Sequence, residues 1–120
     1  MASFAGAFPE LAFDLGAELR ATGRADIARE LEAAGVRAVT YDPESDTGLV
    51  ALEAERPLNA VERDVVGQKL GQVIAFGGSR YASLQLDNFG RVIGVEFSAP
   101  PKELRWKLLR LAVDNQRRRT

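Results

Sequence analysis

Apolar residues recur at helical spacing through the first third of the chain. From residue 8 to residue 34 they follow one another at intervals of three or four, the period of one face of an α-helix. Pro9 suits a first helical turn, where its missing N–H leaves no bond unmade. Gly23 interrupts the pattern and Gly35 ends it, and glycine favours the left-handed backbone that follows a helix. We therefore expect two short helices in a hairpin, or one kinked helix, over residues 8–35.

The period changes from helical spacing to alternation after Gly35. In VRAVTYD (36–42) the residues Val36, Ala38 and Thr40 alternate with Arg37, Val39 and Tyr41, and GLVALEAE (48–55) alternates in the same manner beyond a short polar stretch, which is the pattern of a β-hairpin. A second hairpin is indicated by ASLQLDNFGRVIGVEF (82–97), with Gly90 supplying the positive φ that such turns use. The alternation places on the same face Ala82, Leu84 and Leu86 of the first strand, and Ile93, Val95 and Phe97 of the second. We expect residues 36–99 to form an antiparallel sheet built from these two hairpins.

The segment from Ala60 to Phe76, between the hairpins, carries mixed signals. Asn59 and Glu62 have the spacing of a capping box, and the apolar positions from residue 66 to residue 74 follow a helical stripe. Two glycines within the stripe weaken a helix by up to ~1 kcal/mol each. We expect a helix from about Ala60 to Gln72, and Val73 to Phe76 as either helix or strand.

Pro100 and Pro101 end the last strand and precede a helix over about residues 102–117. The apolar residues of this helix divide into two nearly opposite arcs, the first of Leu104, Leu108, Leu111 and Ala112, the second of Trp106, Leu109 and Val113. One sheet covers only one arc, so we expect the second to pack on the N-terminal helices or on a second subunit. The whole chain, 1–120, is predicted to be one α+β domain, with N-terminal helices (8–35), a sheet (36–99), and a C-terminal helix and basic tail (100–120).

The two hairpins also carry a recognisable motif. YDPESDTGLVAL (41–52), followed by LQLDNFGRVIGVEF (84–97), resembles a family of short uncharacterised bacterial domains that read roughly YDPExD and then LDxDGxxxGxE. The resemblance implies a compact antiparallel sheet in a small α+β accessory domain with no established activity. It implies no catalytic residues.

Composition narrows the chemistry that this chain supports. The sequence contains neither cysteine nor histidine, which removes thiolate zinc sites, catalytic thiols and imidazole bases. No apolar run approaches the ~18 residues that a membrane helix needs. We therefore expect a cytoplasmic bacterial protein that is not an enzyme, needs no cofactor or metal, and does not enter a membrane.

Two polar segments are weak candidates for ligand sites. The alternating acidic residues Asp42, Glu44 and Asp46, followed by Glu53, have some of the spacing of a calcium-binding loop. However, Thr47 stands at the sixth position, where such a loop needs glycine for its sharp turn, and Pro43 stands at the second. We therefore expect a solvated hairpin tip. The segment from Gly77 to Arg80 has the composition of a backbone nest for an anion, without the spacing of a phosphate loop. We expect an ordinary turn there and leave anion binding open.

Charge is unevenly distributed along the chain. Residues 102–120 hold seven Lys or Arg and two acidic residues, a net charge of +5, whereas the first 101 residues hold nine basic and fifteen acidic residues, a net charge of −6. A basic helix end binds phosphates by releasing counterions. Nucleic-acid binding, as in an antitoxin-like regulator, is therefore an alternative function, with these candidate contacts: Arg110, Arg117, Arg118 and Arg119.

The two-sided C-terminal helix motivates the first functional hypothesis. An apolar arc that the sheet does not cover needs another partner, and Trp106, Leu109 and Val113 form that arc. We expect a small interaction module that binds a second copy of itself, or another small protein, through its helical faces.

Overall fold

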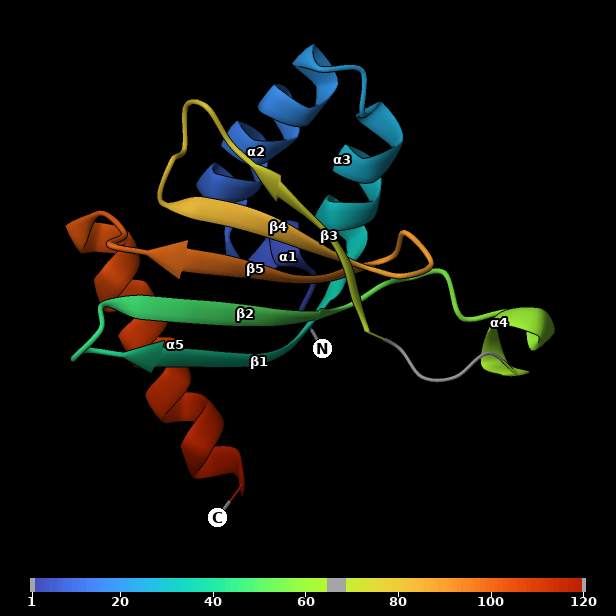
Figure 1. The fold of residues 1–120 in the computed structure, drawn as a ribbon. Coiled ribbons are helices and arrows are strands. Elements are labelled where there is room, and N and C mark those ends of the chain that lie inside the picture. Colours follow the sequence, from blue (N-terminus) through green and yellow to red (C-terminus); the bar gives the residue numbers. More distant parts are fainter. Residues whose placement is uncertain (1, 65–68, 120) are drawn as a thin grey trace.

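Figure 1 presents the computed structural model of the protein, which describes residues 2–64 and 69–119, with the side chains of residues 64, 118 and 119 left aside. In chain order the elements are α1 (Phe4–Ala7), α2 (Pro9–Ala21), α3 (Ala25–Ala33), β1 (Gly35–Asp42), β2 (Thr47–Glu53), α4 (Ala60–Asp64), β3 (Leu70–Ala75), β4 (Ala82–Asp87), β5 (Val92–Ser98) and α5 (Lys102–Arg119). The strands form one antiparallel sheet in the order β1-β2-β5-β4-β3. The predicted α+β class is confirmed.

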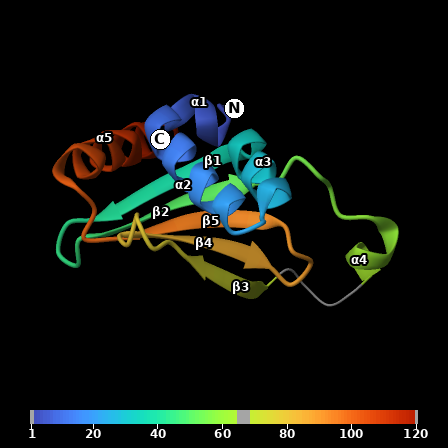
Figure 2. The ribbon, with the colours of Figure 1, turned by 90° about the horizontal axis from the view of Figure 1, so that it is seen from above.

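The helices α1, α2, α3 and α5 all lie on one face of the sheet (Figure 2). Burial follows from this arrangement, since the fully buried side chains come from that face and from the helices that cover it. The largest are Phe4, Phe8, Leu15, Leu19, Leu31, Val50, Leu84, Val92, Val95, Phe97, Pro100 and Leu108. Among the described residues no helix covers the opposite face, so the domain has two layers.

The N-terminal helical hairpin is confirmed, with two additions. Gly23 has φ +79° between α2 and α3, as its position in the pattern predicts. Gly35 does not adopt the left-handed conformation expected of it; it is the first residue of β1, and the helix before it ends on an extended Ala34. The short helix α1 was not predicted, and Ser3 caps it by accepting a hydrogen bond from the Gly6 amide at 3.0 Å.

The expected helix from Ala60 to Gln72 is wrong in its second half. The capping box at its start is real, because the Glu62 amide donates to Asn59 Oδ1 at 2.8 Å and the Asn59 amide donates to Glu62 Oε1 at 3.0 Å. The helix α4 nevertheless ends at Asp64, residues 65–68 lie outside the described part, and Leu70–Ala75 is the edge strand β3. Gly71 lies so close to β4 that a Cβ there would clash with the Asp87 carbonyl oxygen. The close contact between the two strands therefore requires glycine at position 71. From the helical pattern in the sequence, this glycine is expected only to destabilise a helix.

Both hairpins form as predicted, and each contains one shift of register, between Val36 and Ala38 in the first and between Gln85 and Leu86 in the second. Gln85 pairs with Gly94 but Leu86 pairs with Val92, so Ile93 is an extra residue in β5. This β-bulge turns Val92 to the core, where it is fully buried, and leaves Ile93 half-buried. The expectation that Ile93 shares the core face with Phe97 is therefore wrong.

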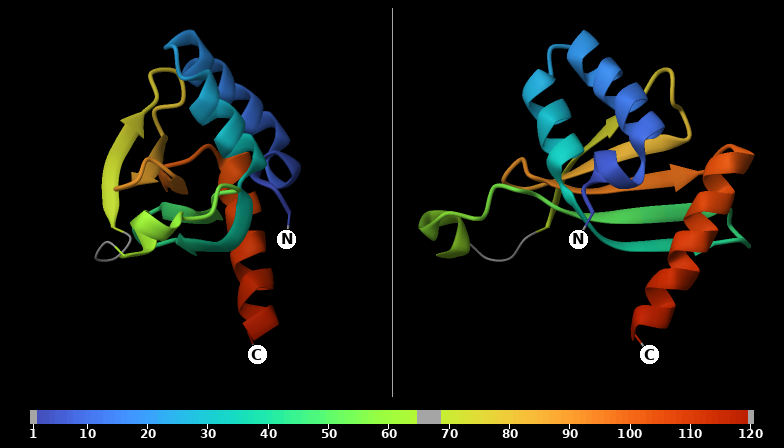
Figure 3. Two further views of the ribbon diagram at one scale, coloured as in Figure 1. Left: turned by 90° about the vertical axis from the view of Figure 1, so that its right-hand side faces the viewer. Right: turned by 180° about the vertical axis from the view of Figure 1, so that it is seen from behind.

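The C-terminal helix α5 lies across β1, and its C-terminal end projects beyond the edge of the sheet (Figure 3). Its fully buried Leu108 packs over β2 at Gly48, where a Cβ would lie 3.2 Å from Leu108 Cδ1. The absence of a side chain at Gly48 thus makes room for the helix.

Candidate protein-interaction surface on the C-terminal helix

The two apolar arcs of α5 are confirmed as separate surfaces. In the inner arc Leu108 is fully buried and Ala112 is 9% exposed, while Leu104 and Leu111 pack partly buried against the core. In the outer arc Trp106 is 62% exposed, Val113 is 40% exposed and Leu109 is half-buried. We call Trp106, Leu109 and Val113 the outer stripe. Large apolar side chains grouped in this way on a surface are typical of an interaction site.

The N-terminal helices do not cover the outer stripe, so that part of the sequence prediction is wrong. They meet α5 on another flank, where Lys107 Nζ lies 4.9 Å from the centroid of the Phe8 ring. Between α2 and α5 on that flank is a cleft of about 370 Å³ whose walls include Glu10, Tyr81 and Glu103. The second alternative, a cover supplied by another subunit, stays a prediction.

The outer stripe borders two depressions. The larger is a groove of about 650 Å³ along α5 itself, lined by Glu103, Trp106, Lys107, Leu109, Arg110, Val113, Asp114 and Arg117. The smaller, of about 270 Å³, lies between α5 and the β1–β2 turn and is lined by Tyr41, Pro43, Asp46, Arg105, Trp106 and Leu109. The Trp106 indole therefore has a depression on each side, which gives a partner's side chains a place to enter.

The β1–β2 turn is held against α5 by a charge-assisted contact. Arg105 donates from Nε and Nη2 to the Asp46 carboxylate at 3.1 Å and 3.0 Å. Asp46 also accepts from the Tyr41 hydroxyl, and this hydrogen bond is the largest cause that raises the pKa of Tyr41 above its usual 10.0. Asp42 accepts from the Glu44 amide and the Ser45 hydroxyl, both at 3.0 Å. These carboxylates organise the turn, and among the described residues no set of acidic, His or Cys side chains is grouped to hold a metal ion.

The loop from Gly77 to Arg80 does hold an anion, but one from its own chain. The amides of Gly78 and Ser79 donate to the two carboxylate oxygens of Glu18, at 2.8 Å and 3.2 Å. This contact fastens the β3–β4 connection to α2. Sequence spacing gave no sign of it, because Glu18 and Gly78 are sixty residues apart.

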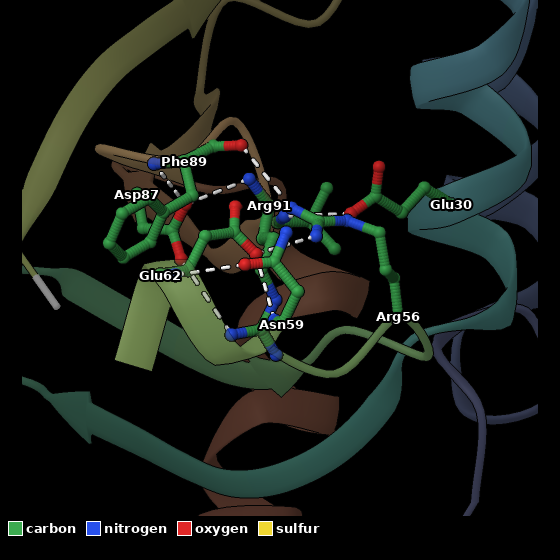
Figure 4. A network of polar contacts seen from close by, with 8 residues as sticks. Glu30, Arg56, Asn59, Glu62, Asp87, Phe89 and Arg91 are labelled. Carbon is green, nitrogen blue, oxygen red and sulfur yellow. Dashed lines mark hydrogen bonds and ion pairs between the residues drawn. The ribbon is translucent and has the colours of Figure 1, made fainter. Parts of the chain in front are cut away.

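A polar network lies at the other end of the sheet, around the β4–β5 turn (Figure 4). Asp87 is 2% exposed and its Oδ1 accepts from the Phe89 and Arg91 amides, both at 2.8 Å. Arg56 donates to Glu62 at 2.9 Å and to the Phe89 carbonyl at 3.4 Å. The Arg56 hydrogen bond is the largest cause that lowers the pKa of Glu62 below 4.5. The bonds tie the segment before α4 to the β4–β5 turn, which is a structural role.

A further bond links the network to α3, since the Val92 amide donates to Glu30 at 3.2 Å. Only the capping box of this network was visible in the sequence. The Asp87 contacts lie within one turn, where an aspartate is a local signal of such bonds. The contacts of Arg56 with Phe89 and of Glu30 with Val92 join segments distant in the chain, which residue spacing does not indicate.

The predicted basic contacts lie near the outer stripe. Arg110 and Arg117 line the same groove as Trp106 and Val113. The side chains of Arg118 and Arg119 lie outside the described part. The structure thus places two of the four candidate arginines beside the apolar stripe.

Comparisons with protein-family models, with curated proteins and with solved structures find no match for this chain. Among the described helices, none has the length and apolar content that crossing a membrane requires. The function is therefore inferred from the geometry of the surface itself.

Proposed function

We propose that this protein is a small, non-enzymatic cytoplasmic interaction module that binds a protein partner through the outer stripe of α5. The exposure of Trp106, at 62%, is the observation that carries the proposal. Tryptophan is among the residues that contribute most to protein interfaces, because it buries a large apolar area and loses little side-chain entropy. Leu109 and Val113 extend the same stripe along the helix.

Core packing and a charge-assisted contact hold the outer stripe in place. The inner arc anchors α5 to the core through Leu108, and the contact of Arg105 with Asp46 fixes the β1–β2 turn beside Trp106. A surface that is already ordered loses little conformational entropy when it binds. The depressions on each side of the indole suit side chains of a partner.

The direct test is to change the stripe and measure protein binding. The Trp106→Ala variant should lose most of its association with a protein partner, whether another copy or a different chain, in sedimentation or pull-down measurements. Val61→Ala is the control, because Val61 is 75% exposed on α4, away from α5 (Figure 1). Association that both variants retain equally would exclude the stripe as the contact surface.

A nucleic-acid ligand is the second candidate, since Arg110 and Arg117 line the same groove as the exposed Trp106. Arginines pair with phosphates, and an indole stacks on unpaired bases. Binding of single-stranded oligonucleotides that falls steeply as the salt concentration rises, and that Arg110→Ala and Arg117→Ala both weaken, would favour this candidate. If no oligonucleotide binds at low salt concentration, a nucleic-acid ligand is excluded.

A further inference from the structure

We infer that the partner of the outer stripe is a second copy of this chain, packed with its α5 antiparallel to the first across a two-fold axis. The inference rests on the proposed function, because it uses the same stripe and names the partner. Two features of the described surface carry it: the symmetric placement of the outer stripe and the opposite charges at its ends.

The stripe is placed almost symmetrically about Arg110. Trp106 lies four residues before Arg110 and Val113 lies three residues after it, so two antiparallel helices with their axis near Arg110 bring each Trp106 against Val113 of the second copy. The same patch then serves on both chains, which is the requirement of a two-fold interface. The large indole meets a smaller side chain, and the flanking groove provides the space.

The charges at the two ends of the stripe are opposite in sign. Glu103 lies seven residues before Arg110, and Arg117 lies seven residues after it, roughly 10 Å along the helix in each direction at ~1.5 Å per residue. Antiparallel packing therefore brings Glu103 to Arg117 of the second copy, twice per dimer, and brings Lys107 near Asp114. Parallel packing would bring like charges together at both ends.

One residue beside the outer stripe opposes the dimer, and it provides a separate test. Arg110 lies near the axis and faces Arg110 of the second copy, which places two like charges together. Arg110→Leu removes this repulsion and extends the apolar stripe. We therefore expect Arg110→Leu to tighten self-association by about tenfold or more, the ratio that corresponds to ~1.4 kcal/mol.

The decisive experiment is a charge reversal on the full chain, followed by sedimentation velocity from low to high micromolar concentration. Glu103→Arg and Arg117→Glu should each weaken the dimer by about tenfold or more, since each brings like charges together twice. The double variant and an equimolar mixture of the two single variants should both regain the wild-type dissociation constant to within about threefold, since each restores opposite charges. Glu55→Arg, the same charge change on an exposed residue outside α5, should have no effect.

The outcomes separate the inference from the proposed function. If Trp106→Ala weakens self-association but the charge reversals do not, the stripe is the interface and the antiparallel arrangement is wrong. If the wild-type chain is monomeric at every concentration, or binds an oligonucleotide through the stripe instead, the second copy is wrong as the partner. Circular dichroism of each variant at low concentration checks that the fold is intact, and the mixture of single variants restores dimers only if both chains are folded.

Discussion

Truncation of a side chain should destabilise the monomer much more on the inner face of α5 than on its outer face. Leu108 is fully buried over Gly48, so Leu108→Ala removes a core side chain and leaves a cavity. Such substitutions cost about 3 kcal/mol or more, which for a domain of this size lowers the melting temperature by roughly 10 °C. Trp106 is larger, but it is 62% exposed, so Trp106→Ala should cost only part of the ~3–5 kcal/mol of a buried aromatic, about 1–2 kcal/mol.

Urea unfolding at low protein concentration measures both values without a contribution from self-association. The expected order is that Leu108→Ala is the more destabilising, although it removes fewer atoms. At high protein concentration the difference in unfolding free energy between wild type and Trp106→Ala should increase, because dimer formation then stabilises the wild-type chain. A loss for Trp106→Ala at low concentration as large as that for Leu108→Ala would show that the indole belongs to the core, and would refute the separation of the two faces.

Three further predictions concern the rest of the fold. Glu18→Ala removes the acceptor of two loop amides and should destabilise the chain by about 1–2 kcal/mol, with faster hydrogen exchange of those amides; unchanged exchange would exclude the anchor. Gly71→Ala places a Cβ in a clash with the Asp87 carbonyl oxygen and should lower the free energy of unfolding in urea by more than about 2 kcal/mol, whereas a neutral result would show that β3 can move away from β4. Because the pKa of Glu62 is lowered below 4.5, its contribution is present above that pH and is lost as the pH falls through the lowered pKa, so Glu62→Gln should flatten the acid side of the stability profile. A profile identical to wild type between neutral pH and the acid transition would exclude the Arg56 hydrogen bond as the cause.

The sequence predicts the elements whose signals are local. The alternation of the two hairpins and the positive φ at Gly90 depend on neighbouring residues, and both are confirmed. The two arcs of α5 are also local, because a helical wheel follows from residue spacing alone. The sequence therefore predicts that the outer stripe lies off the sheet, but it does not predict which surface packs against the stripe.

The failures involve contacts between distant segments. In the sequence, Gly71 only lowers the expected stability of a helix. The close contact of its backbone with β4 is what explains a glycine at this position. Glu18 reads as one charge on a solvated helix face, yet it fastens a loop sixty residues away. The bulge at Ile93 depends on the pairing of β4 with β5. In each case the deciding physical term is a tertiary contact, which periodicity does not contain.

The most direct measurement of the central claim uses the fact that the chain has a single tryptophan. Its fluorescence therefore reports on Trp106 alone. If the outer stripe is the contact surface between copies, the emission should shift to shorter wavelength, and quenching by acrylamide should fall, as the protein concentration rises. The same titration of Val113→Ser should show a weaker response at each concentration. The contrary result is that light scattering reports a dimer while emission and quenching remain those of a solvent-exposed indole at every concentration. That result would place the interface elsewhere and contradict the claim that the outer stripe is the contact surface.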